Sequence, residues 1–456
     1  MKTNYLFYFT AFFLIQFNST LSALATEVEL IQDKDFKKGG ISTVSPIMSY
    51  IFRTYTAKDE ALNSSHKEGS YKSYTLNGST CLEYGVDKNS LKRYLLKYPR
   101  TATTSMPIWS LGQWDSKGAI GLNSADKVVS GYLTADGRAV EFRDGDSTSA
   151  YKKLKIGQLG SGYRYLHMRL NGYEEYNGVL GPPMTSTISG NTLTFPTGTS
   201  TQKIYDRVAD KYYTVSASCF ERPHPQLLIG ATIPPQQSIG QMNSLNLKMQ
   251  MKVLDNYLKG SLVSGFNAMK AQMTAHFKIH VQIQNMKTNS DGTKPAGYGQ
   301  GINLSINAFD VRFPDPSSAI SGNPEGAWLH RPTLSLMRMI PASDFGANFL
   351  QNLYNNGNYK KWATLNIDLL KYLKGNCPTP QAIAPAGCLK SFFQMAQEYC
   401  TSAQWSSGTC PITPRVSENL SDYYVTNLNF GWEVSSPHNV EMQISDMGLT
   451  YTPSSP

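Results

Sequence analysis

Long runs of strictly alternating apolar and polar residues dominate the second half of this chain. In 245–253, Leu, Met and Val alternate with Asn, Lys and Gln, and the segments 277–284, 302–307, 427–434 and 440–444 follow the same rule. A period of two sends successive side chains to opposite faces of a β-strand. The pattern therefore predicts antiparallel strands, each with one buried face and one wet, polar face.

The polar positions of these runs carry many amides and histidines, whereas a merely solvated face usually carries Lys, Glu and Thr. Amide and imidazole groups both donate and accept hydrogen bonds, so such a face suits a polyhydroxylated ligand. The predicted ligand-binding residues are His280, Gln282, Asn303, Asn307, Asp310, Arg312, Asn429 and Glu433. The prediction requires His280, Asn303 and Asn429 to project from neighbouring strands into one shared concavity.

Composition narrows the class of fold and of partner. Only 16% of the residues are charged, whereas the chain has 36 glycines and 24 prolines, a mixture that favours β-structure with many turns. The 42 basic and 33 acidic residues give a net charge of +9, but the basic residues are scattered and form no long stripe. A nucleic-acid partner is therefore not expected.

The N-terminus has the pattern of an export signal. Lys2 precedes an apolar stretch over 5–17, and Ala23-Leu24-Ala25 has the small-x-small form that a signal peptidase accepts. We expect residues 1–25 to be a signal peptide and the mature chain to begin near Thr26, in a secreted or periplasmic protein. An uncleaved anchor is the alternative. No later run reaches about twenty apolar residues, so no transmembrane span is expected in the mature chain.

An even number of cysteines in a chain expected to be exported predicts disulfide bonds. The six are Cys81, Cys219, Cys377, Cys388, Cys400 and Cys410. The last four lie within one 34-residue stretch and would form two local bridges with three possible connectivities, while Cys81 and Cys219 could pair with each other. Zinc is the rival for this cluster, but the cluster has no C-x-x-C pair. P-loop, G-x-S-x-G and H-E-x-x-H motifs are also missing, so neither a metal nor a cofactor is predicted.

The chain divides into β-rich segments on either side of a proline-rich stretch. Residues 26–220 carry Asn-Gly and Asp-Gly turn signals, which predict a first β-rich domain with a hairpin at 131–143 and one helix at 88–97. The stretch 221–239 is expected to be a linker or a strand that crosses between sheets. The remainder, 240–456, contains the alternating runs.

The second domain is expected to be interrupted by helices. Residues 289–301 form a loop rich in Gly, Lys and Pro, typical of a long hairpin. Helical spacing over 345–353, 362–373 and 389–399 predicts a cysteine-rich helical insertion spanning about 342–410. The predicted fold class is mainly β, with an antiparallel jelly-roll sandwich at the C-terminus and a second β-rich domain before it.

Several short motifs in 240–456 resemble secreted bacterial jelly-roll proteins of the lectin and glucanase type. In order, they are a strand ending in Phe309-Asp310-x-Arg312, Trp362 followed by Asp368-Leu369-Leu370, the run Phe430 to Val434 (Phe-Gly-Trp-Glu-Val), and a final Leu449-Thr450-Tyr451. The resemblance covers roughly the last 220 residues and implies a β-sandwich that interacts with carbohydrate. The family's catalytic E-x-D-x-x-E strand is missing here, which argues against glucanase activity.

Candidate catalytic groups are sparse. Glu433 follows the amides of its strand and could act as a general acid with Asp310 as its partner. Asp310 and Arg312 could instead form a structural ion pair, and Asp310 with Asp315 could contribute to a calcium site. A lyase would use residues such as His280, Gln282, Tyr298 and Arg312. His276 and His280 share a strand face but lie ~13 Å apart by strand rise, which is too far to chelate one ion.

Three hypotheses about function follow. The first is an exported carbohydrate-binding protein that recognises a glycan or polysaccharide on the amide-rich face without catalysis. The second is a polysaccharide hydrolase or lyase that uses the same face. The third is a surface interaction or virulence-type protein, in which the face is only solvated and the loops contact another protein.

Overall fold

The computed structural model describes residues 26–36, 109–113, 131–143 except 137, 152–159, 163–172, 226–258, 275–311, 335–377, 388–398, 416–434 and 438–454, with positions 120 and 407. Within these ranges, only the backbone is described at 158–159, 163, 257–258, 335–336, 356 and 397–398. The same holds for the strands at 51–56, 70–76, 79–85, 93–97, 128–130, 192–193, 201–206, 211–216, 261–262 and 327–330. The predicted signal peptide, Arg312 and Asp315 lie outside the described residues. In the part of the chain that is described, no helix is both long and apolar enough to cross a membrane.

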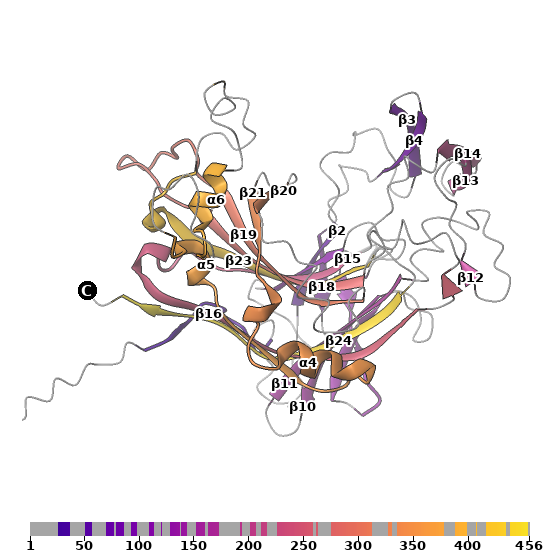
Figure 1. Cartoon of the computed structure of the whole chain (residues 1–456). Coiled ribbons are helices and arrows are strands. Elements are labelled where there is room, and N and C mark those ends of the chain that lie inside the picture. The colour runs from indigo at the N-terminus through magenta and orange to yellow at the C-terminus, as the bar shows by residue number, and fades with distance from the viewer. Residues whose placement is uncertain are drawn as a thin grey trace, which may run out of the picture.

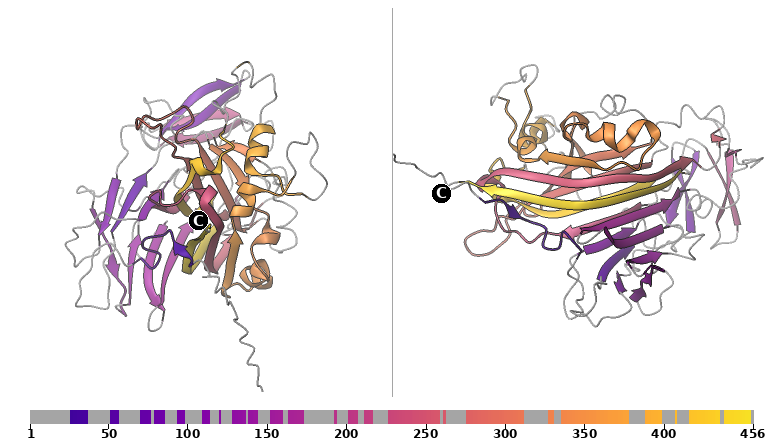
Figure 2. Two further views of the ribbon diagram at one scale, coloured as in Figure 1. Left: turned by 90° about the vertical axis from the view of Figure 1, so that its left-hand side faces the viewer. Right: turned by 90° about the horizontal axis from the view of Figure 1, so that it is seen from below.

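Two sheets stack face to face to form the body of the protein (Figures 1 and 2). The large sheet has ten strands in the order β20 (Ala327–His330), β21 (Ser335–Met339), β19 (Gly301–Asp310), β18 (Ala275–Asn285), β23 (Tyr423–Val434), β15 (Gln226–Thr232), β6 (Trp109–Gln113), β2 (Ile51–Thr56), β5 (Arg93–Lys97) and β7 (Val128–Ser130). Its central pairs, from β19 to β6, are antiparallel.

The small sheet has eight strands. Their order is β22 (Ala363–Asp368), β16 (Met242–Leu258), β24 (His438–Pro453), β11 (Tyr163–Asn171), β10 (Lys152–Leu159), β9 (Ala139–Arg143) and β8 (Tyr132–Leu133), and β1 (Val28–Glu29) pairs with β24. The separate pairs are β3 (Ser70–Leu76) with β4 (Ser79–Gly85), β12 (Thr192–Leu193) with β17 (Ser261–Leu262), and β13 (Thr201–Asp206) with β14 (Lys211–Ser216). The fold is mainly β, a jelly-roll sandwich, as the sequence predicted.

The core lies between the two sheets and is built from the apolar positions of the alternating runs. Phe277, Ile279, Val281 and Ile283 of β18 are fully buried, as are the apolar residues of β16 and β24 that face them. Trp432 joins the sheets directly, because its indole nitrogen in the large sheet donates a 3.2 Å hydrogen bond to the Met168 carbonyl of the small sheet. The predicted strands at the alternating runs are therefore confirmed.

Two segments predicted to be helices are strands. Residues 363–368, expected to be helical, form β22 at the edge of the small sheet, where Ala363, Leu365 and Ile367 are buried and alternate with exposed residues. The prediction of a helix from the spacing of the leucines was wrong here. The same segment also alternates apolar and polar residues with a period of two, and its pairing with β16 stabilises the strand that this period fits. Similarly, 93–97 forms β5 between β2 and β7.

Short helices remain in the predicted insertion. They are α4 (Phe349–Tyr354), α5 (Leu370–Lys374) and α6 (Phe392–Glu398), with single 3₁₀ turns at Ala342–Asp344 and Asn355–Gly357. The helices lie along one side of the sandwich (Figure 2). Two further 3₁₀ turns, Ile239–Gln241 and Leu420–Asp422, precede β16 and β23.

Strands from both sides of 221–239 belong to the same two sheets. β15 lies within this stretch of sequence and pairs with β6 on one side and β23 on the other. In the small sheet, β24 likewise pairs with β11. The hairpin predicted at 131–143 is present as β8 and β9, and the Thr134 amide donates to the Ala139 carbonyl across its turn.

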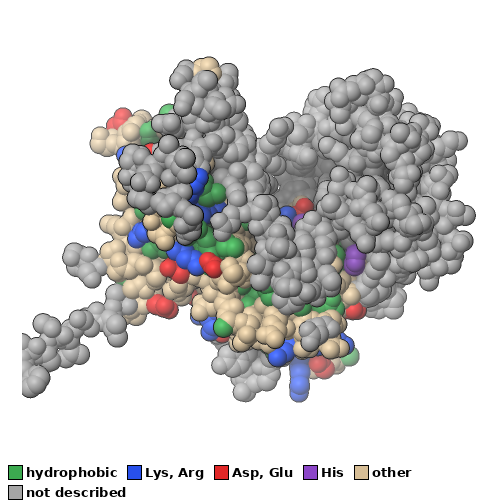
Figure 3. All heavy atoms as spheres, viewed as in Figure 1, with side chains coloured by type: hydrophobic (Ala, Val, Ile, Leu, Met, Phe, Trp, Pro, Cys, Tyr) green, Lys and Arg blue, Asp and Glu red, His purple; other side chains and the backbone are tan. Residues whose placement is uncertain are grey.

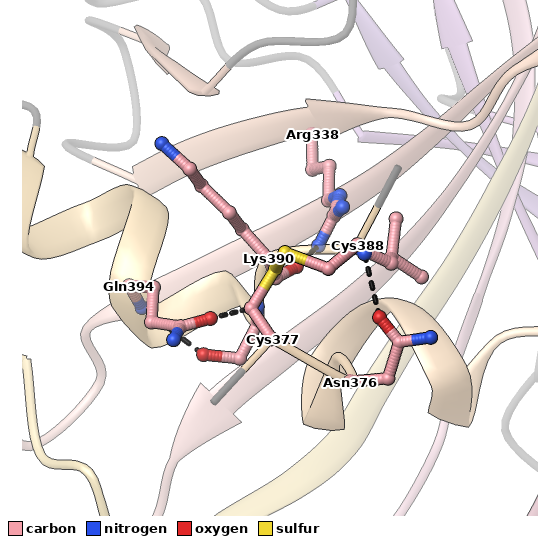
Figure 4. The surroundings of a disulfide bond; sticks show 8 residues. Arg338, Asn376, Cys377, Cys388, Lys390 and Gln394 are labelled. Carbon is pink, nitrogen blue, oxygen red and sulfur yellow. Dashed lines mark hydrogen bonds between the residues drawn. A yellow bond between two sulfur atoms is a disulfide. The ribbon is translucent and has the colours of Figure 1, made fainter. Parts of the chain in front are cut away.

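A disulfide between Cys377 and Cys388 cross-links the chain just before α6 (Figure 4). A hydrogen bond next to the disulfide joins the same two segments, because the Asn376 side-chain oxygen accepts from the Leu389 amide at 2.6 Å. The buried Arg338 of β21 donates to the Tyr372 and Lys390 carbonyls at 2.6 and 2.7 Å. Predicted bridges that involve Cys81, Cys219, Cys400 and Cys410 rest on side chains outside the described residues.

The close approach of β15 to β23 at Gly431 can be tested by substitution. A Cβ atom at Gly431, whose φ is +152°, would lie 2.1 Å from the Leu227 carbonyl oxygen. We expect Gly431→Ala to lower the free energy of unfolding by about 3 kcal/mol or more, measured by urea denaturation. The matched control is Gly292→Ala, where φ is +80° but nothing lies within 4 Å. It should lose only about 1 kcal/mol, and equal losses would contradict the steric explanation.

Candidate functional site

One side of the large sheet faces the core, and the other side, here called the polar face, carries the predicted binding residues. It is built by three neighbouring strands: β18 contributes His276, Lys278, His280 and Gln282, β19 contributes Asn303, Ser305, Asn307 and Asp310, and β23 contributes Asn427, Asn429 and Glu433. Near the middle of the view in Figure 3, acidic, basic and histidine side chains lie close together.

The strand register arranges these residues in rows across the sheet. From one end, the rows are Asp310, His276 and Glu433; then Asn307, Lys278 and Gly431; then Ser305, His280 and Asn429; then Asn303, Gln282 and Asn427. Every predicted binding residue except Arg312, which is outside the described residues, therefore lies on this face. Their role in binding remains a prediction.

A β-bulge brings Asp310 onto the polar face. Between Phe277 and Lys278 of β18 the register shifts by one residue, so that Ala308 is skipped on β19. Simple alternation would send Asn307 and Asp310 to opposite faces, whereas the bulge leaves them on the same one. The Asn307 amide nitrogen donates a 3.1 Å hydrogen bond to the Asp310 carboxylate.

The backbone of Asp310 is held from outside the sheet. The Tyr354 hydroxyl of α4 accepts from the Asp310 amide at 2.9 Å and donates to the Asp310 carbonyl at 3.1 Å. The Tyr354 ring stacks on Phe309, with ring centroids 4.8 Å apart. The helical segment thus fixes one end of the polar face.

The β19 side of the polar face is buried, although alternation predicts a wet face. Ser305 is fully buried, and Asn303 and Asn307 are only 8 and 9% exposed. Several side-chain atoms of the polar face have no hydrogen-bond partner among the described residues: Ser305 Oγ and Asn307 Oδ1 on β19, Asn427 Oδ1 on β23 and His276 Nδ1 on β18. A buried polar atom left without a partner costs about 1–3 kcal/mol. The face therefore contains buried polar groups whose hydrogen-bonding capacity is not used within the described residues.

The floor of the polar face is shaped by a glycine next to Asn429. Gly230 of β15 lies opposite Asn429, and a Cβ atom there would be 2.1 Å from the Asn429 side-chain oxygen. The Asn429 side-chain oxygen therefore lies directly over Gly230. Ser110 of β6 donates a 3.1 Å hydrogen bond to the Gly230 carbonyl and extends the polar surface by one more strand.

A charged cluster occupies one end of the face. The Glu433 carboxylate lies 2.9 Å from Lys278 Nζ and 3.0 Å from His276 Nε2. Burial raises the pKa of Glu433, but the positive charge of Lys278 and the contact with His276 outweigh burial and hold the pKa well below its usual value. Burial, aided by Lys278, lowers the pKa of His276 against the pull of Glu433. At neutral pH the cluster is an ionised carboxylate beside a neutral imidazole.

Sequence reasoning missed part of this site. Lys278, Ser305 and Asn427 were not among the predicted binding residues, and His276 was weighed only as a metal ligand. The alternating pattern could have identified all four residues, since each occupies a polar position on the same strands as the predicted binding residues. No group of three His, Cys, Asp or Glu side chains within the described ranges is placed to hold a metal ion.

No protein-family model and no curated protein sequence matches this chain. Among solved structures, it is similar to a meso-active, thermostable cellulase derived from the Cel12A cellulase of Rhodothermus marinus, with 10% identity, a TM-score of 0.26, and coverage of 70% of this chain and 95% of that one. It is also similar to a family 12 xyloglucanase from Bacillus licheniformis (9%, 0.24, covering 70 and 96%). A third is the family 11 xylanase from Neocallimastix patriciarum (8%, 0.26, covering 69 and 91%). These scores carry no argument about function.

Acidification should destabilise the fold through two histidines whose pKa values are lowered, the buried His276 and the partly buried His438. Burial lowers the pKa of His438, at the start of β24, from 6.5 to about 4, against the pull of the nearby Asp310. The unfolded chain then binds more protons than the folded chain between these values, so stability falls as the pH falls. His276, with its lowered pKa, acts in the same direction.

We expect the free energy of unfolding to fall by up to about 1.4 kcal/mol per pH unit for His438 between pH 6.5 and 4. Below about pH 4.5, protonation of Glu433 should add a further loss, because its folded-state pKa is depressed. Urea denaturation across this range would measure the slope. The variant His438→Asn should have a shallower slope, and an unchanged slope would contradict the assignment.

Proposed function

We propose that this protein binds a glycan or polysaccharide on the polar face without cleaving it. The observation that carries the proposal is a set of buried polar atoms that have no hydrogen-bond partner in the described part of the chain: Ser305 Oγ, Asn307 Oδ1, Asn427 Oδ1 and His276 Nδ1. They lie on the same face of three adjacent strands. Because they include acceptors and a hydroxyl that both donates and accepts, they match the hydroxyl groups of a sugar.

The charged end of the face supports a binding role. Glu433 is ionised and paired with Lys278, so it offers acceptor oxygens to sugar hydroxyls but carries no proton to give to a leaving group. Hydrogen bonds to an ionised acceptor are stronger than neutral ones. The paired lysine also neutralises the carboxylate, which favours an uncharged ligand.

The second candidate is glycoside hydrolysis, favoured by one observation. Asp310 and Glu433 lie in one row on the strands either side of β18. Their backbones are thus two strand spacings apart, ~9.5 Å, which is closer to the carboxyl separation of inverting enzymes than to that of retaining enzymes. His276 lies between them, in the space that the attacking water of an inverting enzyme would need. Because His276 fills that space and the pKa of Glu433 is lowered, binding is the better-supported function.

Ser305→Ala tests the binding role without disturbing the fold. The substitution removes only a buried hydroxyl that has no partner, so stability should stay unchanged or rise. Retention on the glycan identified from an array should weaken about threefold to tenfold, and Gln282→Ala should have a similar effect. The control is Thr364→Ala, an exposed position on the small sheet. Wild-type retention by both polar-face variants, or no glycan bound at all, would contradict the proposal.

A product assay separates binding from catalysis. Incubated with the glycan that it retains, the protein should release neither reducing nor unsaturated ends. Glu433→Gln should weaken retention without changing product levels, which stay at background. Release of ends by the wild-type chain, abolished in Glu433→Gln, would favour the hydrolase instead.

A further inference from the structure

A second polar hollow lies on the opposite side of the molecule, on the outer surface of the small sheet. Its volume is about 420 Å³, and residues from four adjacent strands, β1, β24, β16 and β22, contribute to its lining. Asn246 and Lys248 reach it from the polar positions of β16, whose alternate residues Leu245 and Leu247 are in the core. It is therefore separated from the polar face by the full thickness of the sandwich.

A β-bulge shapes this pocket. Between the pairs Lys248–Gly448 and Gln250–Ser445, β24 contains one more residue than β16. The extra residue leaves Asp446 in a left-handed conformation with φ of +45°. For a residue other than glycine, this conformation costs about 1–2 kcal/mol. Such strain persists at positions where the side chain has a use, and the Asp446 carboxylate accepts a 2.8 Å hydrogen bond from Lys248 at the pocket wall.

Glu29 forms the opposite wall. One of its carboxylate oxygens accepts hydrogen bonds from the Ile31 and Leu449 amides, both at 3.0 Å. The other oxygen is buried and accepts no hydrogen bond, and its nearest ammonium group, Lys34, is 3.5 Å away. A Cβ atom at position 448 would lie 3.1 Å from this oxygen, closer than most Cβ contacts, so glycine there allows the carboxylate to lie close over the backbone. The pocket wall thus contains a carboxylate that two backbone amides hold in place.

The chemistry of the wall selects the class of ligand. Three carboxylates, Glu27, Glu29 and Asp446, would repel an anionic ligand. Two ammonium groups, Lys34 and Lys248, would repel a cationic one. Apart from Met447, the remaining lining groups are two amides, one hydroxyl and Gly448, so an apolar ligand would leave the polar groups unpaired. Hydroxyl groups donate to carboxylates and accept from ammonium groups, so they can satisfy both kinds of wall.

We propose that this pocket is a second binding site for a neutral, polyhydroxylated molecule of monosaccharide or disaccharide size. Its volume lies in the range of small-molecule sites, ~300–1,000 Å³. It shares no residue with the polar face and does not depend on the function proposed there.

The test is a titration followed by NMR chemical-shift changes of the full chain. The probes are glucose, galactose, cellobiose and maltose at millimolar concentrations, with glucuronate and glucosamine as the charged comparisons. At least one neutral probe should give saturable shifts at Gly448 and Asn366, and neither charged comparison should bind as tightly. Failure of every neutral probe, or equal binding of a charged one, would overturn the proposal.

Two variants localise the site. Asp446→Gly removes the carboxylate and relieves the left-handed strain, so the fold should be as stable as wild type or more stable while binding weakens at least about tenfold. Asn366→Ala, an exposed change on β22, provides a second test if Asp446→Gly fails to fold. The matched control is Ser305→Ala on the polar face, which should leave the shifts at Gly448 unchanged. Unaltered binding in the pocket variants would refute this location.

Discussion

The pairing of β18 with β23 is the constraint on which the rest of the structure depends. In this register Phe277 lies opposite Trp432, with their rings edge to face and 5.2 Å apart, and the Trp432 indole reaches across the core to the Met168 carbonyl. Because side chains alternate along a strand, the same register places His276 opposite Glu433 on the outer side. Core packing and the charged end of the polar face are therefore two consequences of one alignment.

On the outer side of each sheet, an ionised glutamate contacts a histidine and a basic residue of the neighbouring strand. Glu433 is held by His276 and Lys278, two residues apart on β18. Glu441 of β24 is held in the same way by His167 and Arg169 of β11, at 3.0 and 3.1 Å. Burial raises the pKa of each carboxyl, yet the neighbouring histidine and cation keep it below its usual value. Such carboxylates serve as acceptors rather than proton donors.

Stability and the proposed function oppose each other on the polar face. Each buried polar atom without a partner costs about 1–3 kcal/mol, and a whole domain is usually stable by only about 5–15 kcal/mol. A core of large apolar residues, extended by the contact of Tyr354 with Phe309, offsets that cost. Substitutions such as Ser305→Ala are therefore informative, because a gain in stability with a loss of binding is the signature of a site maintained for a ligand.

The alternating runs determined the strands β16, β18, β19, β23 and β24, and they identified most of the polar residues that lie together on β18, β19 and β23. Periodicity could do this because side-chain direction along a strand is a local property of the chain. Local pattern was insufficient at 363–368, where leucine spacing fits a helix but the edge of the small sheet requires a strand.

Only the tertiary structure decided the remaining features. The bulge at Ala308 places Asp310 on the polar face. Burial leaves the Ser305 hydroxyl, at a position that the sequence predicts to be solvated, without a hydrogen-bond partner among the described residues. Strands before residue 221, such as β6 and β11, join the same sheets as strands after it. The bulge at Asp446 lies at a pocket that Glu29 also lines, more than four hundred residues earlier in the chain. Bulges, burial and edge pairing depend on which distant strand lies alongside, and that neighbour is chosen by the packing of the whole chain rather than by any one segment.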